Sequence, residues 1–405
     1  MKYVVLVAPY LGDMMVKCLQ SFCALSDIRL GIISHQGFAQ FPKELQGKIS
    51  GHYQVANTLN PADLIKATHA FQKEWGRVDR LIGYLEHLQL PLAETRTALD
   101  IPGMKAETAR NFRDKNKMKE VLSAAKLPVA RQAKVHSLQE VQQFLLDVQY
   151  PIILKPLAGV GSQNTVRVNN EKELYSALNL LLPSPSNPIQ AEEFVLGEEH
   201  TLESVSINGK VVWQSSTYYL PGPLAVLENP FLQYCVLLPS QSKQPHVKKF
   251  SKTNEKALKA LGMETGLSHM EWFLQESGRA LISEVGARPP GVNIMTMLSI
   301  AHGVNMWDKW AELVVHDNWS IPRRKNAVGC AFLRHQGSGK RIQSITGLDE
   351  VKEKLKNSWV SAKLPFIGQH KSPHYEGEGW IIVKGKKNED VVAALRTIIT
   401  TVQVR

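Results

Sequence analysis

The segment on which the fold assignment rests reads Ser268-His-Met-Glu-Trp-Phe-Leu-Gln-Glu276-Ser277-Gly-Arg-Ala-Leu-Ile-Ser-Glu-Val285. Two strand-like, largely apolar runs flank Ser277-Gly278, and a serine–glycine pair between such runs predicts a β-hairpin. If these two residues form the loop, Glu276 pairs with Arg279. Counting outward from that pair then places Glu271 directly opposite Glu284 on the neighbouring strand.

This placement would bring two carboxylates together in a buried sheet. Directly opposed side chains have Cβ atoms about 5 Å apart, and like charges at that separation repel each other. The apolar neighbours Met270, Trp272 and Val285 predict burial, which increases the cost of two negative charges. A divalent cation would remove the conflict, and magnesium prefers such oxygen ligands together with phosphate oxygens. The alternative is a shifted register, in which a longer loop separates the carboxylates and leaves one in solvent.

Upstream of the hairpin, a lysine and a glycine-containing loop suggest a phosphate site. The strand-like run Tyr150-Pro-Ile-Ile-Leu-Lys155 leads into the loop Ala158-Gly-Val-Gly-Ser-Gln-Asn164, and Thr165–Val168 is predicted to be the return strand. Loop N–H groups can approach anionic oxygens closely, and the lysine adds a positive charge. The structural alternative is a surface lysine beside an ordinary turn.

The first part of the chain, residues 1–104, alternates strand and helix patterns. The expected strands are Val4–Ala8, Arg29–Ser34 and Arg80–Tyr84, and the expected helices are Met14–Leu25 and Pro61–Trp75. Strands separated by helices predict a parallel α/β sheet. A dinucleotide site is not supported, because no GxGxxG pattern follows the first strand.

The segment 105–150 is expected to be helical and basic. Its stretch Arg110–Lys119 continues into Val121 and Leu122 as one helix, which Pro128 ends. At the other end of the chain, residues 326–405 contain two strand-like runs followed by an amphipathic helix pattern, which predicts an α+β arrangement.

Composition excludes several classes of protein. The chain has 405 residues, which corresponds to two or three domains at roughly 150 residues each. Its net charge of +11 suits an anionic ligand such as a nucleotide, or simply a solvated basic surface. A nucleic-acid role rests on charge alone, since no aromatic and basic recognition motif is present. The four cysteines form no CxxC pair, and no run reads as a signal peptide or membrane span, so we expect a cytoplasmic protein.

Together, and in this order, these pieces resemble the ATP-grasp superfamily of ligases, such as biotin carboxylase, D-alanine–D-alanine ligase and the L-amino acid ligases. The resemblance implies an ATP-grasp fold of mixed α/β and α+β class. A parallel α/β pre-domain would occupy 1–104, and the ATP-grasp domain 105–325. Within that domain the lid subdomain would cover about 115–196 and the metal subdomain about 197–325. A small C-terminal α+β lobe would follow at 326–405.

The resemblance also implies which residues contact the ATP phosphates. Lys115, in Arg-Asp-Lys115, is similar to the first phosphate-contacting lysine of the family, and Lys155 is similar to the second. Lys155 would also act in catalysis. Gly159, Gly161 and Ser162 fall in the loop that closes over the phosphates.

For the base and the ribose, the segment Gln-Ala-Glu192-Glu193-Phe-Val195 is similar to the family's hinge. Glu192 and Glu193 would mark the hinge, and Val195 would offer its backbone to the adenine. Glu199 would accept from the ribose hydroxyls, and Phe273 would pack beneath the base. Taken alone, this acidic segment is equally well an ordinary charged strand edge.

By the same resemblance, Glu271 and Glu284 match the family's metal-binding pair. Gly286 stands where the family commonly has asparagine, which is a departure that affects a second metal site. Arg288 aligns with the active-site arginine, whose planar fork can hold a carboxylate or an acyl phosphate. Its structural alternative is an arginine that bridges the hairpin to the next helix.

The implied function is an ATP-dependent ligase that joins a carboxylate to an amine through an acyl phosphate, releasing ADP and phosphate. ATP and Mg²⁺, or Mn²⁺ in its place, would be required. The partners would be a small carboxylate and an amine, with amino acids as candidates, and the chain is compatible with a homodimer. No specific nucleic acid and no membrane is expected as a partner. The alternatives are a carboxylase, a purine-type ligase or a non-catalytic ATP-binding regulator.

Two further features concern the unidentified substrate. The turn-rich stretch Tyr218–Pro230 is expected to form part of the substrate wall. Glu86 follows the Arg80–Tyr84 strand, where a pre-domain side chain can point at the cleft. It would either hold an ammonium group or, as the simpler interpretation, cap a helix.

Overall fold

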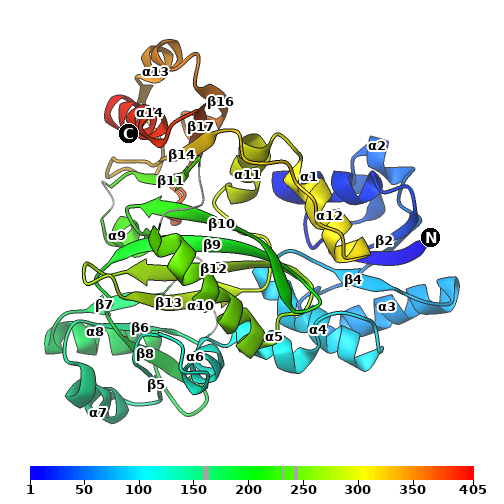
Figure 1. Ribbon diagram of the computed structural model, residues 1–405, viewed down its shortest axis with the longest axis horizontal. Coiled ribbons are helices and arrows are strands. Elements are labelled where there is room, and N and C mark those ends of the chain that lie inside the picture. The colour runs from blue at the N-terminus through cyan, green and yellow to red at the C-terminus, as the bar shows by residue number, and fades with distance from the viewer. Residues whose placement is uncertain (158–163, 230–231, 241–244) are drawn as a thin grey trace.

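The computed structural model describes residues 1–157, 164–229, 232–240 and 245–405 (Figure 1). Its N-terminal part contains a parallel four-stranded sheet in the order β3-β2-β1-β4. The strands are β1 (Lys2–Val7), β2 (Ile28–Ser34), β3 (Gly51–Gln54) and β4 (Arg80–Ile82). The helical elements around them are α1 (Asp13–Cys23), η1 (Phe38–Gln40), α2 (Lys43–Gln46), α3 (Pro61–Trp75), η2 (Glu86–Leu88) and α4 (Gln89–Ala98). The predicted parallel α/β sheet is therefore present, with β3 as an additional edge strand.

Two short helices, α5 (Ala106–Arg113) and α6 (Lys115–Ala124), replace the single helix expected after residue 110. Asp114 separates them, because its backbone is extended and its carboxylate accepts from the N–H groups of Asn116 and Lys117. An aspartate in this position caps the N-terminus of a new helix. The expected continuous helix was wrong, since local capping by Asp114 overrides the continuous basic pattern.

A small antiparallel sheet with the strand order β5-β8-β6-β7 forms the lower left of Figure 1. Its strands are β5 (Gln132–Val135), β6 (Ile152–Pro156), β7 (Val166–Val168) and β8 (Ile189–Glu193). Helices α7 (Leu138–Val148) and α8 (Glu171–Leu181) bury their apolar sides against it. Lys155 lies one residue before the end of β6, and it lines a pocket together with residues of the central sheet.

The central sheet has eight strands in the order β13-β12-β9-β10-β11-β14-β17-β16. Its strands are β9 (Glu198–Ile207), β10 (Lys210–Leu220), β11 (Tyr234–Leu238), β12 (Gly266–Leu274), β13 (Ala280–Gly286), β14 (Ala327–Leu333), β16 (Trp359–Lys363) and β17 (Gly379–Gly385). The helices after β8 are α9 (Pro223–Glu228), α10 (Pro245–Leu261), α11 (Ile294–His302), α12 (Met306–His316), α13 (Leu348–Lys354) and α14 (Asn388–Thr401). A separate two-stranded ribbon pairs β15 (Ile345–Thr346) with β18 (Gln403–Val404).

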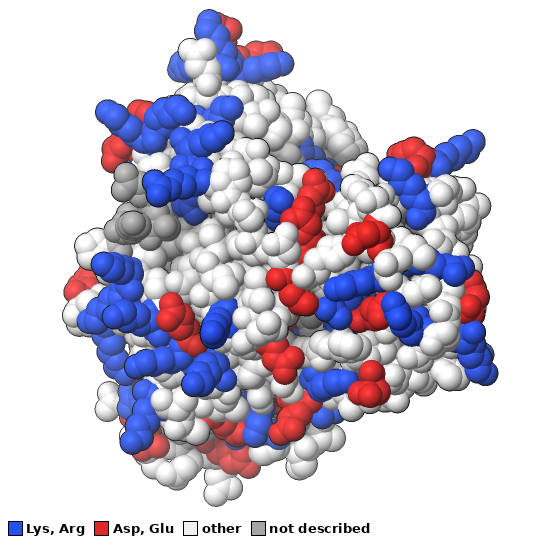
Figure 2. Space-filling view, turned by 45° about the vertical axis from the view of Figure 1, so that its right-hand side comes forward, with Lys and Arg blue, Asp and Glu red and all other residues white. Residues whose placement is uncertain are grey.

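The C-terminal strands extend this central sheet, because β14 pairs with every residue of β11. Residues 326–405 are thus hydrogen-bonded to the strands that precede them. A large core joins the N-terminal part to the sheet, with Phe22 of α1 packed edge-on against Trp310 of α12. On the face seen in Figure 2, basic and acidic side chains are interspersed. Among the described residues, no helix is long and apolar enough to cross a membrane.

Candidate nucleotide and metal site

The predicted hairpin is formed by β12 and β13, and Glu271 pairs with Glu284 as expected. The loop, however, is one residue longer than predicted: the Gln275 N–H donates to the Arg279 carbonyl at 2.9 Å, so Glu276 does not pair with Arg279. Gly278 closes the turn with φ +76°, a conformation that favours glycine. Further along, the register shifts between Glu271 and Trp272, which leaves one extra residue in β13 as a bulge.

The two deviations cancel each other. An extra loop residue moves the register by one, and the bulge at Ser283 moves it back before Glu284 is reached. The opposed carboxylates were therefore predicted correctly from an incorrect loop. A bulge next to a site re-aims side chains, and here it brings Glu284 back onto the face of Glu271.

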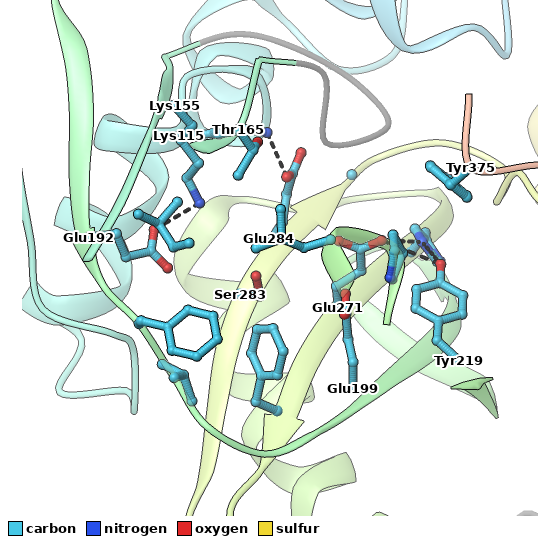
Figure 3. A pocket seen from close by; sticks show the side chains of 18 of the residues that line it. Lys115, Lys155, Thr165, Glu192, Glu199, Tyr219, Glu271, Ser283, Glu284 and Tyr375 are labelled. Atoms are coloured by element: carbon cyan, nitrogen blue, oxygen red, sulfur yellow. Dashed lines mark hydrogen bonds and ion pairs between the residues drawn. The ribbon is translucent and has the colours of Figure 1, made fainter. Parts of the chain in front are cut away.

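A lysine and a tyrosine hydroxyl contact the two carboxylates. The Lys115 Nζ lies 2.5 Å from Glu284 Oε2, and the Tyr219 hydroxyl donates to Glu271 Oε1 at 3.3 Å (Figure 3). The described residues contain no group of three or more His, Cys, Asp or Glu side chains placed to hold a metal ion. A two-carboxylate set nevertheless fits Mg²⁺, which binds proteins through one or two carboxylates and takes its other ligands from phosphates and water.

Glu199 is a third carboxylate near this pair (Figure 3). Burial raises the pKa of Glu199 well above its usual value, and the negative charge of Glu271 raises it further. A Cβ atom on Gly222 would collide with the Glu199 carboxylate, so the glycine leaves room for this side chain. The position of the Glu199 carboxylate therefore depends on the turn that follows β10, where Gly222 lies.

Lys155 and Glu192 form a buried ion pair on neighbouring strands of the small sheet. The Lys155 Nζ lies 2.8 Å from Glu192 Oε2, and a second lysine, Lys119 of α6, lies 3.1 Å from Glu192 Oε1. Burial by itself would raise the pKa of Glu192, but the two lysines lower it to about 2. Sequence reasoning missed Lys119. Its i+4 spacing from Lys115, which places both on one side of α6, was the available signal.

The hinge residues lie where the two sheets meet. Glu193 forms an ion pair with Arg131 at 2.5 Å. In the described part of the chain the two buried lysines pair with Glu192 and not with Glu193. Val195 packs with Leu281 and the partly buried Phe273 in a small apolar cluster. These apolar side chains lie beside the segment predicted to be the hinge, and ligand pockets are lined mostly by side chains of this kind.

Arg288 is held by Glu86, which comes from the N-terminal part of the chain. Arg288 Nε donates to one carboxylate oxygen of Glu86, and Arg113 Nη1 donates to the other at 2.6 Å. Burial alone would raise the pKa of Glu86, but the two arginines lower it to about 2. The expected helix-capping role of Glu86 was wrong, because its carboxylate is used by these arginines. A Cβ on Gly286 would lie 3.2 Å from Glu86 Oε2, so glycine at this position admits Glu86.

His269 is a second residue that sequence reasoning missed. Its Nδ1 lies 3.0 Å from Glu203 Oε1, and its Nε2 lies 3.5 Å from Glu271 Oε1. The hydroxyls of Thr201 and Thr217 also donate to the fully buried Glu203. Burial would lower the pKa of His269, but its hydrogen bonds to Glu203 and Glu271 raise it to about 9. The pattern His-Met-Glu, which puts His269 and Glu271 on one face of a strand, was the available signal.

One pocket brings the predicted residues together. All the predicted site residues in the described part of the chain line it, namely Lys115, Lys155, Glu192, Glu193, Val195, Glu199, Glu271, Phe273, Glu284 and Arg288. Gly159, Gly161 and Ser162 lie outside the described residues. From the expected substrate wall, Tyr219, Pro223 and Leu224 also line the pocket. Tyr375 of the C-terminal part completes the lining, and no local sequence pattern signalled its position.

Comparison with known proteins points to one family. The model of the ATP-grasp domain matches residues 120–301. Alanine–anticapsin ligase of Bacillus subtilis strain 168 is 24% identical over 238 residues, which are 53% of this chain and 49% of that protein. The L-arginine-specific L-amino acid ligase of Bacillus subtilis is 21% identical over 297 residues, 71% of this chain and 69% of the relative. The chain thus spans about half the length of the first of these relatives and about two thirds of the second.

Solved structures resemble the whole chain. The L-amino acid ligase from Bacillus licheniformis has a TM-score of 0.78 at 22% identity, covering 100% of this chain and 98% of that one. N5-carboxyaminoimidazole ribonucleotide synthetase from Thermotoga maritima has a TM-score of 0.68 at 16% identity, covering 100% and 99%. At these identities the likeness establishes the fold alone, and it confirms the expected ATP-grasp fold.

Proposed function

We propose that this chain, whose residues 120–301 are an ATP-grasp domain, is an ATP-dependent ligase that joins a carboxylate to an amine and releases ADP and phosphate. The observation that carries the proposal is the convergence of the lysines, the carboxylate pair and Arg288 on one pocket. The similarity to L-amino acid ligases makes amino acids the first substrates to test. The absence of a CxxC pair among its cysteines fits a cytoplasmic enzyme.

The phosphate end of the proposed site is built from lysines of two elements. Lys115 at the start of α6 and Lys155 at the end of β6 both line the pocket beside Glu284. In the proposed reaction their charges stabilise the oxygens of the γ-phosphoryl group while it moves. Glu271 and Glu284 would hold Mg²⁺ or Mn²⁺, which supplies further neutralisation of phosphate charge when it is bound.

The proposed reaction has two steps. First, a carboxylate oxygen attacks the γ-phosphorus, the bond from phosphorus to the β–γ bridging oxygen breaks, and ADP leaves with that electron pair. An acyl phosphate results. Then the amine nitrogen attacks the acyl carbon, the carbon–oxygen bond to phosphate breaks, and the amine loses one proton. Arg288 would grip the substrate carboxylate, and hence the acyl phosphate, at the cleft side of the hairpin.

Release of ADP and phosphate with pairs of amino acids from a library tests this proposal, with the product identified by mass spectrometry. Glu284→Gln should abolish turnover while its thermal unfolding stays close to that of the wild type, because the substitution removes a charge needed for the metal. The matched control is Glu276→Gln, an exposed glutamate of the same hairpin, which should retain full activity.

Two results would contradict the proposed reaction, and a third would contradict the role given to the carboxylate pair. Release that requires bicarbonate and no amine would indicate a carboxylating enzyme. Binding of ATP and Mg²⁺ without release above background for any acceptor would indicate a nucleotide-binding regulator. Full activity of Glu284→Gln at ordinary magnesium concentrations would show that the carboxylate pair has been assigned the wrong role.

A further inference from the structure

Lys119 is a buried lysine without a role in the reaction described above. It lies on α6, one turn after Lys115, and its side chain is 1% exposed. Its Nζ donates to Glu192 Oε1 at 3.1 Å and to the backbone carbonyl of Ile282, also at 3.1 Å. Lysine is almost never buried to this extent unless it is paired, so the position calls for an explanation.

Glu192 is shared between Lys119 and Lys155. Each lysine uses a different carboxylate oxygen, and the Gln190 side chain donates to the oxygen on the Lys155 side at 2.8 Å. Figure 3 shows Lys155 directed at Glu192 from the pocket side. Lys155 lines the pocket, whereas Lys119 is not among the described residues that line it. The two lysines are therefore not equivalent: Lys155 lies where it can reach a ligand in the pocket, whereas Lys119 is buried and does not line the pocket.

A phosphate group in the pocket would compete with Glu192 for Lys155. If Lys155 were the sole cation on Glu192, a shift of its ammonium group toward phosphate would leave a buried carboxylate without a counter-ion. Leaving a buried charge unpaired is strongly unfavourable, so the lysine would stay on Glu192. With Lys119 fixed on the other oxygen, Glu192 keeps one ion pair when Lys155 moves.

We propose, on the basis of the proposed function, that Lys119 is a positioning residue. It acts as a permanent counter-ion of Glu192, which leaves Lys155 free to bind the ATP phosphates. The Ile282 carbonyl holds Lys119 in place from the hairpin side, so its ammonium group stays on Glu192. The competing explanation is that Lys119 only ties the small sheet to the central sheet, because its two acceptors belong to those two sheets.

Binding of ATP and of adenosine, measured by calorimetry, separates the two explanations. Adenosine lacks the phosphates, so the ratio of the two dissociation constants reports the phosphate contacts alone. In Lys119→Met we expect adenosine binding to stay near the wild-type value and ATP binding to weaken by about tenfold or more, the value of one charge-assisted hydrogen bond. Lys155→Ala should show a loss of the same kind. Lys117→Met is the matched control on the same helix, where the lysine is 54% exposed.

Equal weakening of ATP and adenosine in Lys119→Met would overturn the inference and leave the proposed function intact. If the wild-type protein binds ATP no better than adenosine, both the inference about Lys119 and the proposed function are contradicted. If Lys119→Met does not fold, the double variant Lys119→Met with Glu192→Gln is used to separate the two explanations. It removes the positive charge of Lys119 and the negative charge of Glu192 together, so neither charge of that pair is left unpaired. There Lys155 has no carboxylate to hold it, so the ATP-to-adenosine preference should equal or exceed the wild-type value. A preference as low as that of Lys155→Ala would overturn the inference.

Discussion

Arg288 is positioned by the protein itself, because Glu86 accepts from its Nε and the Pro289 carbonyl accepts from its Nη1 at 2.8 Å. A guanidinium can hold Glu86 with one edge and present the rest of its fork to a substrate carboxylate, whereas an ammonium group cannot do both. We predict that Arg288→Lys keeps the affinity for a non-hydrolysable ATP analogue but lowers product formation by on the order of a hundredfold. Calorimetry and a product assay measure the two quantities.

The matched control for Arg288→Lys is Arg110→Lys, where the arginine is 54% exposed and pairs with Glu94 at 2.9 Å. This change should leave both quantities unaltered, since surface ion pairs contribute little. Weaker nucleotide binding with an unchanged turnover number in Arg288→Lys would place Arg288 on the nucleotide side of the site or in the scaffold.

At the scale of the element, the end of β13 is shaped around a side chain from another part of the chain. A methyl group on Gly286 would lie 3.2 Å from Glu86 Oε2, and Glu86 cannot retreat easily because two arginines hold it. We predict that Gly286→Ala destabilises the protein by about 1 kcal/mol and lowers turnover, as Arg288 loses its partner. Thermal unfolding and steady-state kinetics measure the two effects.

Gly47→Ala is the comparison for Gly286→Ala, because no atom lies within 4 Å of the added methyl group and its φ of −69° suits any residue. It should leave turnover unchanged and not lower stability. Wild-type stability and turnover in Gly286→Ala would mean that Glu86 has more room than its contacts indicate.

At the scale of the whole molecule, Glu86 links η2, α5 and the end of the hairpin, which are three separate parts of the chain. Its pKa falls from 4.5 to about 2 in the folded protein. Such a carboxylate adds stability that is complete above the unfolded pKa and is lost as the pH falls through the folded pKa. We therefore predict that wild type exceeds Glu86→Gln in free energy of unfolding most clearly above pH 4.5, and that the difference shrinks toward pH 2.

Urea unfolding of the two proteins over this pH range tests the prediction. Glu94→Gln is the control, because Glu94 is partly exposed and pairs with a single surface arginine. Its difference from the wild type should be small at every pH. A difference for Glu86→Gln that does not change with pH would show that the charge of Glu86 adds nothing to folding and that the side chain acts by shape alone.

Local periodicity and the spacing of neighbouring residues are enough to predict several features of this protein. The alternating elements of the N-terminal sheet and the β12–β13 hairpin follow from the spacing of apolar residues along a strand or a helix. The opposition of Glu271 and Glu284 was predicted correctly only because the longer loop and the bulge at Ser283 cancel each other. The ordered succession of these pieces was enough for the ATP-grasp resemblance, which the comparisons confirm. The assigned ligand contacts remain predictions, although their side chains meet in one pocket.

Contacts between residues far apart in the chain could not be predicted in this way, because they depend on how the packed elements meet. Glu86 and Arg288 are 202 residues apart, Lys119 and Glu192 are 73 apart, and Tyr375 reaches the pocket from the segment between β16 and β17. No periodicity in one segment specifies a partner in another, because such pairs form where packed sheets and helices bring their ends together. Burial makes these pairs necessary for stability, because a charged side chain that is removed from water is strongly unfavourable unless an opposite charge lies next to it.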